Sequence, residues 1–452
     1  MRPWILPALC ALVVFCGFVI PGSEQAGPAL GLSALVALTC AAVWVVPLKE
    51  HPPLMQRKAI WPLLITFGIL LLVLSVLPVI SLMTEKAGGF GGLYDPSSAW
   101  LEYIKLGGVF CAFALGLRVS MTSDGGRKLF DAMLVMGGVW ALVCIIMHIN
   151  DPDGVYGVAK LGAGRLTGAF SSPNSAGTLF GAVSVMALGR IISRYQSLRV
   201  RNPIERIDPL YAAICLLALG ALMLTVSRAA IGVTVVCLVG LTLVLLRRRL
   251  SFWAGLVVVI CLIGAGFLLF AGTFGAVADR LVHLDADMDI RAAIFQAHYE
   301  VASQQPLFGF GLGSFDVINA TIVSESTYRE LAVIRAAHNV YLQWFEETGL
   351  TGLVALIAVN LAVLIPMVRA VLRDVSTAPR LVIIMGVYLV FLLHGLTDYA
   401  LQEMALTLFM AMMLGSGFAM ASNLSQKQMQ ALKRANDEAL AEKEPEYGGP
   451  EG

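Results

Sequence analysis

The sequence predicts an all-α polytopic membrane protein with about twelve transmembrane helices. Of its 452 residues, 58% are apolar and only 13% are charged, whereas soluble domains carry about 25% charged residues. Twelve apolar runs are long enough to span a bilayer, which takes about 20 residues per helix. The 31 basic and 30 acidic side chains nearly cancel, so the charge balance does not point to a nucleic-acid partner.

The predicted crossings have spanning length but differ in quality. They cover residues 4–21, 28–47, 60–82, 101–117, 129–148, 174–192, 209–226, 229–246, 252–270, 350–368, 381–397 and 402–420. The fourth and seventh are the weakest, because Glu102 and Lys105 interrupt one and the other is short. The first also resembles a signal peptide, with Arg2 before its apolar core. We expect it to be retained as a span, because the rest of the chain is equally hydrophobic.

Basic residues alternate between successive loops and predict the orientation. With the N-terminus in the cytoplasm, 22 of the 31 Lys and Arg residues fall in cytoplasmic segments, as the positive-inside rule requires. The chain then divides into nine crossings (1–270), a long outer segment (271–349), three crossings (350–420) and a cytoplasmic tail (421–452). We expect the outer segment to be ordered and functional, since it carries aromatics, glycines and helical periodicity. The tail is predicted to be a short helix that frays into disorder.

The cysteines and acidic residues give no clear metal or disulfide pattern. All eight cysteines lie inside apolar runs, without a metal-binding or disulfide spacing. Asp285, Asp287 and Asp289 alternate, but they lack the glycine and glutamate of a calcium loop. We therefore expect no metal site.

Arg228 is the first candidate functional residue, at the outer turn between the seventh and eighth crossings. An arginine at membrane depth is costly unless it is paired or hydrated, so it marks a functional site by default. The alternative is an interfacial arginine that snorkels towards the headgroups. The short turn, with Ser227 beside it, favours a guanidinium fixed towards a cavity.

Arg291 lies in a second candidate region. Asp289 is a suitable N-cap, so a helix is predicted from there towards Gln304. On that helix Arg291, Phe295 and His298 recur at helical spacing and share one face. A solvated surface helix lying over the membrane is the alternative interpretation.

Two further motifs follow along the outer segment. The run Pro306–Phe315 carries alternating glycines, which suit either a re-entrant turn or a ligand-binding loop. His338, followed by Asn339, stands on the outer side just before the tenth crossing. A lone histidine is more often structural than catalytic, but a neutral imidazole at such a position is suited to be a general base.

Residues 291–352 resemble the signature region of the O-antigen ligase and polymerase superfamily of bacterial envelope enzymes. The similar elements are the helix with Arg291, the Pro306–Gly313 turn, and His338–Asn339 followed by Gly349. Arg165–Asn174 and Ser227–Arg228 are similar to upstream elements of that family. The resemblance therefore covers roughly residues 160–400.

This resemblance implies a GT-C-like glycosyltransferase in the bacterial inner membrane, with cytoplasmic termini, a periplasmic active site and no cofactor. Such enzymes take a glycan from an undecaprenyl diphosphate carrier. Ligases join it to lipid A–core sugar and polymerases join it to another lipid-linked repeat, and both alternatives remain open here. A polysaccharide flippase or secondary transporter is the rival class. It is disfavoured because the arginines and His338 gather at one face of the membrane.

The resemblance also suggests roles for the candidate residues. Arg228 and Arg291 are expected to bind the lipid diphosphate, with Arg165 as a third cation, because guanidinium groups match phosphate oxygens. His338 is the expected catalytic base. Further substrate-binding candidates are Asn174, Asn339 and His298. For His394, Asp398 and Glu403, lining of an acceptor cavity and structural pairing are both open. The residues at the fifth outer loop, which are His148, Asp151, Asp153 and Lys160, are expected to be solvated.

Overall fold

The computed structural model describes residues 4–45, 60–85, 95–160, 164–197, 208–247, 284–325, 327–332, 334–373 and 378–441. Its helices are α1 (Ile5–Val19), α2 (Ala26–Val45), α3 (Ile60–Glu85), α4 (Pro96–Val119), α5 (Ser123–Asn150), α6 (Pro173–Ser197), α7 (Pro209–Leu224), α8 (Arg228–Leu246), α11 (Leu284–Ala302), α12 (Phe315–Ile322), α13 (Tyr328–Leu331), α14 (Val340–Arg373), α15 (Pro379–His394), the 3₁₀ helix η4 (Ala400–Gln402) and α16 (Met404–Ala441). A hairpin of β1 (Gly154–Val155) and β2 (Val158–Ala159) separates α5 from α6. Within these described ranges, seven helices are long and apolar enough to cross a membrane, and four shorter apolar helices accompany them. The predicted all-α polytopic membrane fold is therefore confirmed.

The predicted crossings coincide with helices wherever the chain is described. The first eight fall on α1–α8 and the last three on α14–α16. The ninth, at 252–270, lies outside the described residues. The predicted tail helix is not separate, because α16 continues through it to Ala441. Neither glycine nor proline follows Gly417 within α16, so nothing in the local sequence ends the helix at the end of the predicted crossing.

The start of α11 differs from the prediction. The helix begins at Leu284, so the predicted N-cap at Asp289 is wrong. The preceding segment contains Ala286 and Met288, which favour helix, and acidic residues, which are favourable near a helix N-terminus. These residues extend the helix by more than a turn ahead of Asp289.

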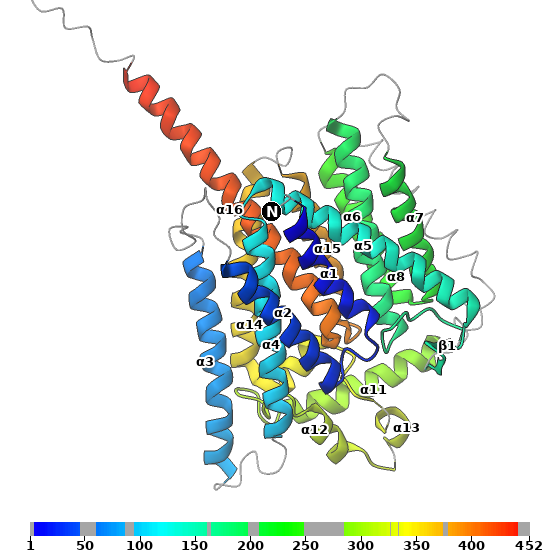
Figure 1. Ribbon diagram of the computed structural model, residues 1–452. Coiled ribbons are helices and arrows are strands. Elements are labelled where there is room, and N and C mark those ends of the chain that lie inside the picture. Colours follow the sequence, from blue (N-terminus) through cyan, green and yellow to red (C-terminus); the bar gives the residue numbers. More distant parts are fainter. Residues whose placement is uncertain are drawn as a thin grey trace, which may run out of the picture.

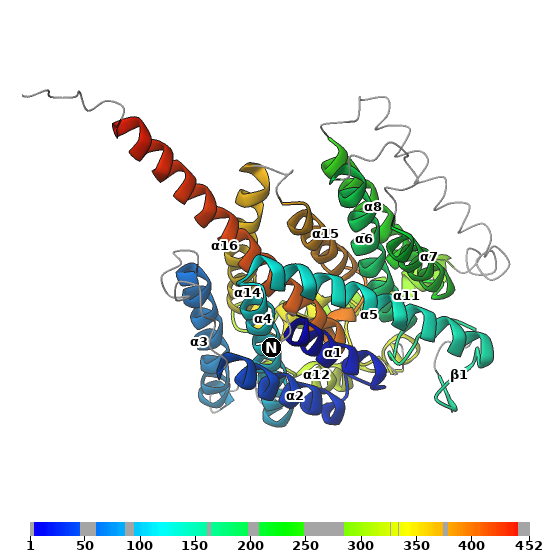
Figure 2. The same cartoon turned by 45° about the horizontal axis from the view of Figure 1, so that its top comes forward.

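The two ends of the bundle differ in structure. Figure 1 shows α11, α12 and α13 together at one end, and the N-terminus and the protruding C-terminal part of α16 at the other. Helix α3 lies at one edge of the bundle in both views (Figures 1 and 2). The end with α11–α13 is the one predicted to face the periplasm, and that orientation stays a prediction.

Helices α6 and α16 form the centre of the bundle. In the most apolar stretch of each, 83% of the residues are buried, against 28–39% in the other long spans. Small residues permit this close packing. A Cβ atom at Gly177 of α6 would lie 2.7 Å from the Cβ of Ala230, and one at Gly181 would overlap the hydroxyl of Thr234, both on α8.

Helices α4 and α16 approach each other at a reciprocal pair of glycines. A Cβ atom at Gly116 would overlap the carbonyl oxygen of Met412, and one at Gly415 would overlap the carbonyl oxygen of Phe113. A hydrogen bond of 2.7 Å between the hydroxyls of Ser120 and Ser416 lies one helical turn further on. Since backbone atoms cannot move aside as side chains can, glycine is required at both positions.

We expect Gly116→Ala to lower the unfolding free energy by about 1–3 kcal/mol, because the added methyl group overpacks a helix–helix contact. Gly107→Ala is the matched control, because Gly107 lies in the same helix and a Cβ atom there would meet no heavy atom within 4 Å. Thermal unfolding of the two purified variants in one detergent measures the difference. Equal melting temperatures would contradict the described α4–α16 contact.

Candidate functional site

The short segment between α15 and η4 gathers side chains from three distant parts of the chain. The carbonyl oxygen of Thr397 accepts a hydrogen bond of 2.6 Å from Nη1 of Arg291. The carboxylate of Asp398 accepts one of 3.3 Å from Nδ2 of Asn174 and pairs with Nδ1 of His338 at 3.4 Å. The segment therefore connects α11, the start of α14 and the start of α6 at the end of the bundle where α11–α13 lie (Figure 1).

Asp398 is a buried carboxylate beside a partly exposed imidazole. Its side chain is 0% exposed, and that of His338 is 25% exposed. Burial alone raises the pKa of Asp398, but the hydrogen bond from His338 and the charges of His394 and His338 hold it below its usual value. An ionised Asp398 on Nδ1 leaves Nε2 as the nitrogen of His338 that can take a proton.

Two non-glycine residues of the site lie in the left-handed backbone region. His338 has a φ of 52° and Val226 a φ of 51°, and among the described non-glycine residues only Tyr156 joins them. A β-branched residue such as Val226 rarely adopts this conformation, which costs about 1–3 kcal/mol. Val226 directly precedes Ser227, which caps α8 by accepting a hydrogen bond from the amide of Ala230. This turn makes Arg228 the first residue of α8.

Arg165 fastens its loop to the same turn. Its Nε donates to the carbonyl oxygen of Thr225 at 2.8 Å, and its Nη2 donates to that of Val226 at 3.3 Å. The Nη2 atom also lies 3.4 Å from Oδ1 of Asn174. Contacts thus run without a break from Arg165 through Asn174 to Asp398. The turn that Arg165 contacts directly precedes Arg228 at the start of α8.

Asn339 and His298, both predicted to bind substrate, have protein partners here. Oδ1 of Asn339 accepts hydrogen bonds of 3.0 Å from the amides of Tyr341 and Leu342, and so caps the start of α14. His298 is fully buried, and its Nδ1 lies 2.8 Å from Oε1 of Glu346. These contacts hold α14 to its entry segment and to α11, the helix that carries Arg291.

The glycine run after Pro306 packs against a kink in α14. Gly349 has a φ of 63° and a ψ of −170° inside that helix. The amide of Leu350 donates to the carbonyl oxygen of Pro306 at 2.8 Å, and that of Phe310 donates to the carbonyl oxygen of Glu346 at 3.0 Å. A Cβ atom at Gly349 would overlap backbone atoms of the run. The close approach of two backbones therefore accounts for these glycines.

His394 and Glu403 are buried side chains that pair with protein groups. Nδ1 of His394 lies 2.6 Å from the hydroxyl of Thr178, and both residues are 0% exposed. Glu403, also 0% exposed, accepts hydrogen bonds from Ser171 and Ser23.

The pairing of Asp398 with His338 could not be predicted from the sequence, because the two are separated by 60 residues and no local pattern links them.

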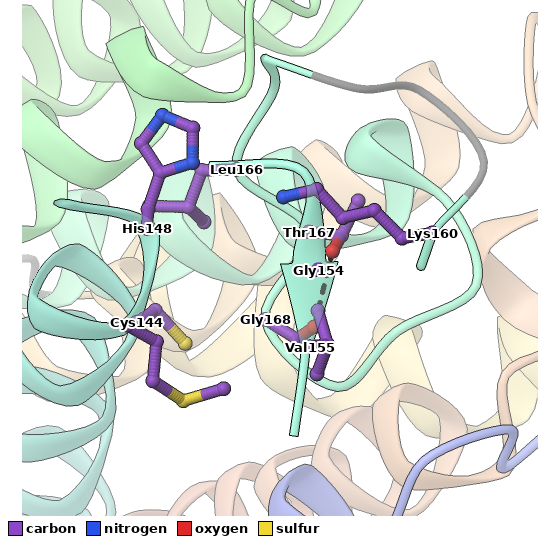
Figure 3. A pocket seen from close by; sticks show the side chains of 9 residues that line it. Cys144, His148, Gly154, Val155, Lys160, Leu166, Thr167 and Gly168 are labelled. Atoms are coloured by element: carbon purple, nitrogen blue, oxygen red, sulfur yellow. Dashed lines mark hydrogen bonds between the residues drawn. The ribbon is translucent and has the colours of Figure 1, made fainter. Parts of the chain in front are cut away.

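The two cavities described here do not include the arginine–histidine cluster. The smaller has a volume of about 10 Å³, which is room for about one water molecule. Figure 3 shows His148 and Cys144 on one side of it and Lys160 on the other. The larger, about 410 Å³, lies between α2 and α4 beside Leu30 and Trp100.

Asp151 and Asp153 are exposed, as predicted, whereas His148 and Lys160 are partly buried and line the smaller cavity. Leu166 and Gly168, from the loop before α6, line the same cavity. Within the described residues, no three His, Cys, Asp or Glu side chains are grouped closely enough to hold a metal ion. The side chains of Asp285, Asp287 and Asp289 lie outside this description.

Comparison with known proteins gives one family match. Residues 213–357 match the family described as O-Antigen ligase, a stretch that includes Arg228, Arg291 and His338. A search of curated proteins found no match for the chain. The matched region supplies α7, α8, α11–α13 and the first half of α14, whereas Arg165, Asn174 and Asp398 lie outside it. This match, together with a cluster of arginines and a histidine at one end of an apolar helical bundle, supports a relationship between this multi-pass membrane protein and the O-antigen ligase and polymerase superfamily.

Proposed function

We propose that this protein transfers a glycan from an undecaprenyl diphosphate carrier to an acceptor sugar at the periplasmic face of the bacterial inner membrane. The observation that carries the proposal is that Arg291 contacts Thr397 while Asn174 and His338 contact the adjacent Asp398. Asn174 also contacts Arg165, which holds the turn that precedes Arg228. The end of the bundle that holds this cluster is opposite to the N-terminus (Figure 1). The positive-inside distribution of basic residues supports a cytoplasmic N-terminus.

The arginines are suited to the leaving group of this reaction. When the bond between the glycan C1 and the phosphate oxygen breaks, negative charge develops on the lipid diphosphate. Guanidinium groups of Arg228 and Arg291 are assigned to stabilise that charge, with Arg165 beside them, because forked donors match phosphate oxygens. Fixed cations placed where charge develops lower the barrier most. The contacts of Arg165 and Arg291 with backbone carbonyls support this preorganisation.

His338 and Asp398 are suited to activate the acceptor. As the acceptor oxygen bonds to C1 of the glycan, its hydroxyl proton passes to Nε2 of His338 and the lipid diphosphate leaves. The carboxylate of Asp398 fixes the imidazole through Nδ1 and stabilises the imidazolium that forms. In this scheme Asn174 donates a second hydrogen bond to the carboxylate of Asp398 and helps to hold it in place. The reaction needs no metal or nucleotide sugar.

The acceptor distinguishes the two activities within the superfamily. A ligase uses lipid A–core sugar, and we propose this acceptor first. A polymerase uses a second lipid-linked repeat and requires the same diphosphate site and the same base. Labelled donor given to the purified protein with each acceptor in turn separates the two activities. Transport without transfer, as in a flippase, would leave the label on the carrier lipid.

We expect Arg291→Ala to reduce glycan transfer about 10²–10³-fold, because a fixed cation at the leaving diphosphate is lost. Arg291→Lys restores the charge without the forked donors, so it should recover only part of the rate. Arg329→Ala is the control, since this arginine lies on α13, is exposed and is outside the cluster. Initial rates with labelled donor measure all three. Full activity of Arg291→Ala would refute the assigned role.

We expect His338→Ala and Asp398→Asn each to lower kcat by at least about 10²-fold, with the KM for the donor little changed, because proton removal from the acceptor is impaired. The double variant should be scarcely slower than His338→Ala, since the two act as one unit. The control is Asp316→Asn, a carboxylate on α12 outside the cluster. Independent, multiplying effects of the two substitutions would argue against the pair.

A further inference from the structure

Glu403 is a fully buried carboxylate that joins three separate parts of the chain. It follows η4 and directly precedes α16, and it is 0% exposed. Its Oε1 accepts hydrogen bonds from the amide of Ser171 at 3.0 Å and from the hydroxyl of Ser171 at 2.6 Å. Its Oε2 accepts one of 2.7 Å from the hydroxyl of Ser23, in the turn between α1 and α2. Both oxygens are therefore used to fasten loops.

The loop that Glu403 fastens carries two residues of the candidate site. Ser171 lies three residues before Asn174 and six after Arg165. Arg165 contacts Asn174, and Asn174 contacts Asp398. Because the loop is short, a shift of Ser171 displaces both side chains relative to His338 and Asp398.

The segment that contains Glu403 also carries the other half of these contacts. Asp398 lies five residues before Glu403. Between them, Tyr399 packs its ring edge-to-face on His338 with centroids 5.0 Å apart. The hydroxyl of Tyr399 interacts with Ser171 and Ser172. The hydrogen bonds from Ser171 to Glu403 therefore join the loop that carries Arg165 to the segment that carries Asp398.

We infer that Glu403 is a positioning residue, which sets the placement of Arg165 and Asn174 for the lipid diphosphate by holding Ser171. The inference rests on the proposed function and extends it to a residue that touches no substrate. The hydrogen bonds with Ser171 serve this role. The hydrogen bond with Ser23 holds the turn between α1 and α2, which carries no residue of the candidate site.

Three substitutions separate the position of the group from its charge. Glu403→Gln keeps the length, and its amide oxygen accepts from Ser171 while its NH₂ group donates to the hydroxyl oxygen of Ser23. It should therefore retain activity within about 3-fold. Glu403→Asp keeps the charge but is one methylene shorter, and Glu403→Ala removes the group. Both should reduce kcat/KM for the donor about 10–100-fold, since misplacement by about 1 Å can cost that much. Ser23→Ala, the matched control, should stay within about 3-fold of wild type.

A double-mutant cycle tests whether Glu403 acts through the diphosphate-binding loop. The full-length protein in nanodiscs is assayed for binding of undecaprenyl diphosphate and for glycan transfer. In the background of Arg165→Ala with Asn174→Ala, adding Glu403→Asp should change either quantity by less than about 2-fold, because no side chain remains to be positioned. The KM for the acceptor should be the same in all variants. A general loss of structure would instead lower donor binding and raise the KM for the acceptor together.

The outcomes distinguish this inference from the proposed function. If the loss caused by Glu403→Asp is undiminished in the double-substituted background, or if Glu403→Gln is as defective as Glu403→Ala, the positioning role is refuted. Wild-type protein that binds undecaprenyl diphosphate but transfers no glycan would refute the proposed function alone. In that case the double-mutant cycle, measured by binding of undecaprenyl diphosphate, would still decide whether Glu403 positions the loop. If Glu403→Ala fails to fold, Glu403→Asp and Glu403→Gln carry the test.

Discussion

The candidate site depends on one requirement, that a carboxylate removed from water must find donors within the protein. Asp398 is fully buried, and its partners are Asn174, 224 residues earlier in the chain, and His338, 60 residues earlier. An ionised group with no such partners would be strongly destabilising. Both contacts fall on Oδ1 of Asp398, and they join α6, the start of α14 and the segment after α15 at one point. The arginines are arranged around it, Arg291 on the neighbouring carbonyl group and Arg165 on Asn174.

Much of the fold follows from local sequence, because a membrane span is a local property. Each described span coincides with an apolar run of sufficient length, and no long-range information is needed to find it. Helix ends were less predictable. Asp289 has the side chain of an N-cap, yet α11 begins at Leu284, because favourable residues ahead of Asp289 outweigh it. The tail joins α16 because the chain offers no residue that would interrupt the helix.

The site was predictable only where a residue type was unusual for its position. Arg228 and His338 are polar residues close to apolar spans, and Arg291 shares one face of a predicted helix with His298, which marks all three out in the sequence. Their supporting groups carry no such mark. The bond from Ser171 to Glu403 crosses 232 residues, and only packed helices bring these residues together. Asn339 and His298 have the right chemistry for a substrate, and in the fold the first caps a helix while the second pairs with Glu346. Side-chain chemistry alone cannot separate these uses.

Helix α16 begins beside Glu403 and extends for 38 residues to Ala441. At 1.5 Å per residue, such a helix measures about 57 Å, so it reaches from the candidate site to well beyond the opposite end of the bundle (Figure 1). A rod of that length amplifies motion. A tilt of about 5° at its base displaces the far tip by about 5 Å. A spectroscopic probe attached near Ala441 would therefore report a change in the tilt of α16 at Glu403, without disturbing any group in the cluster itself.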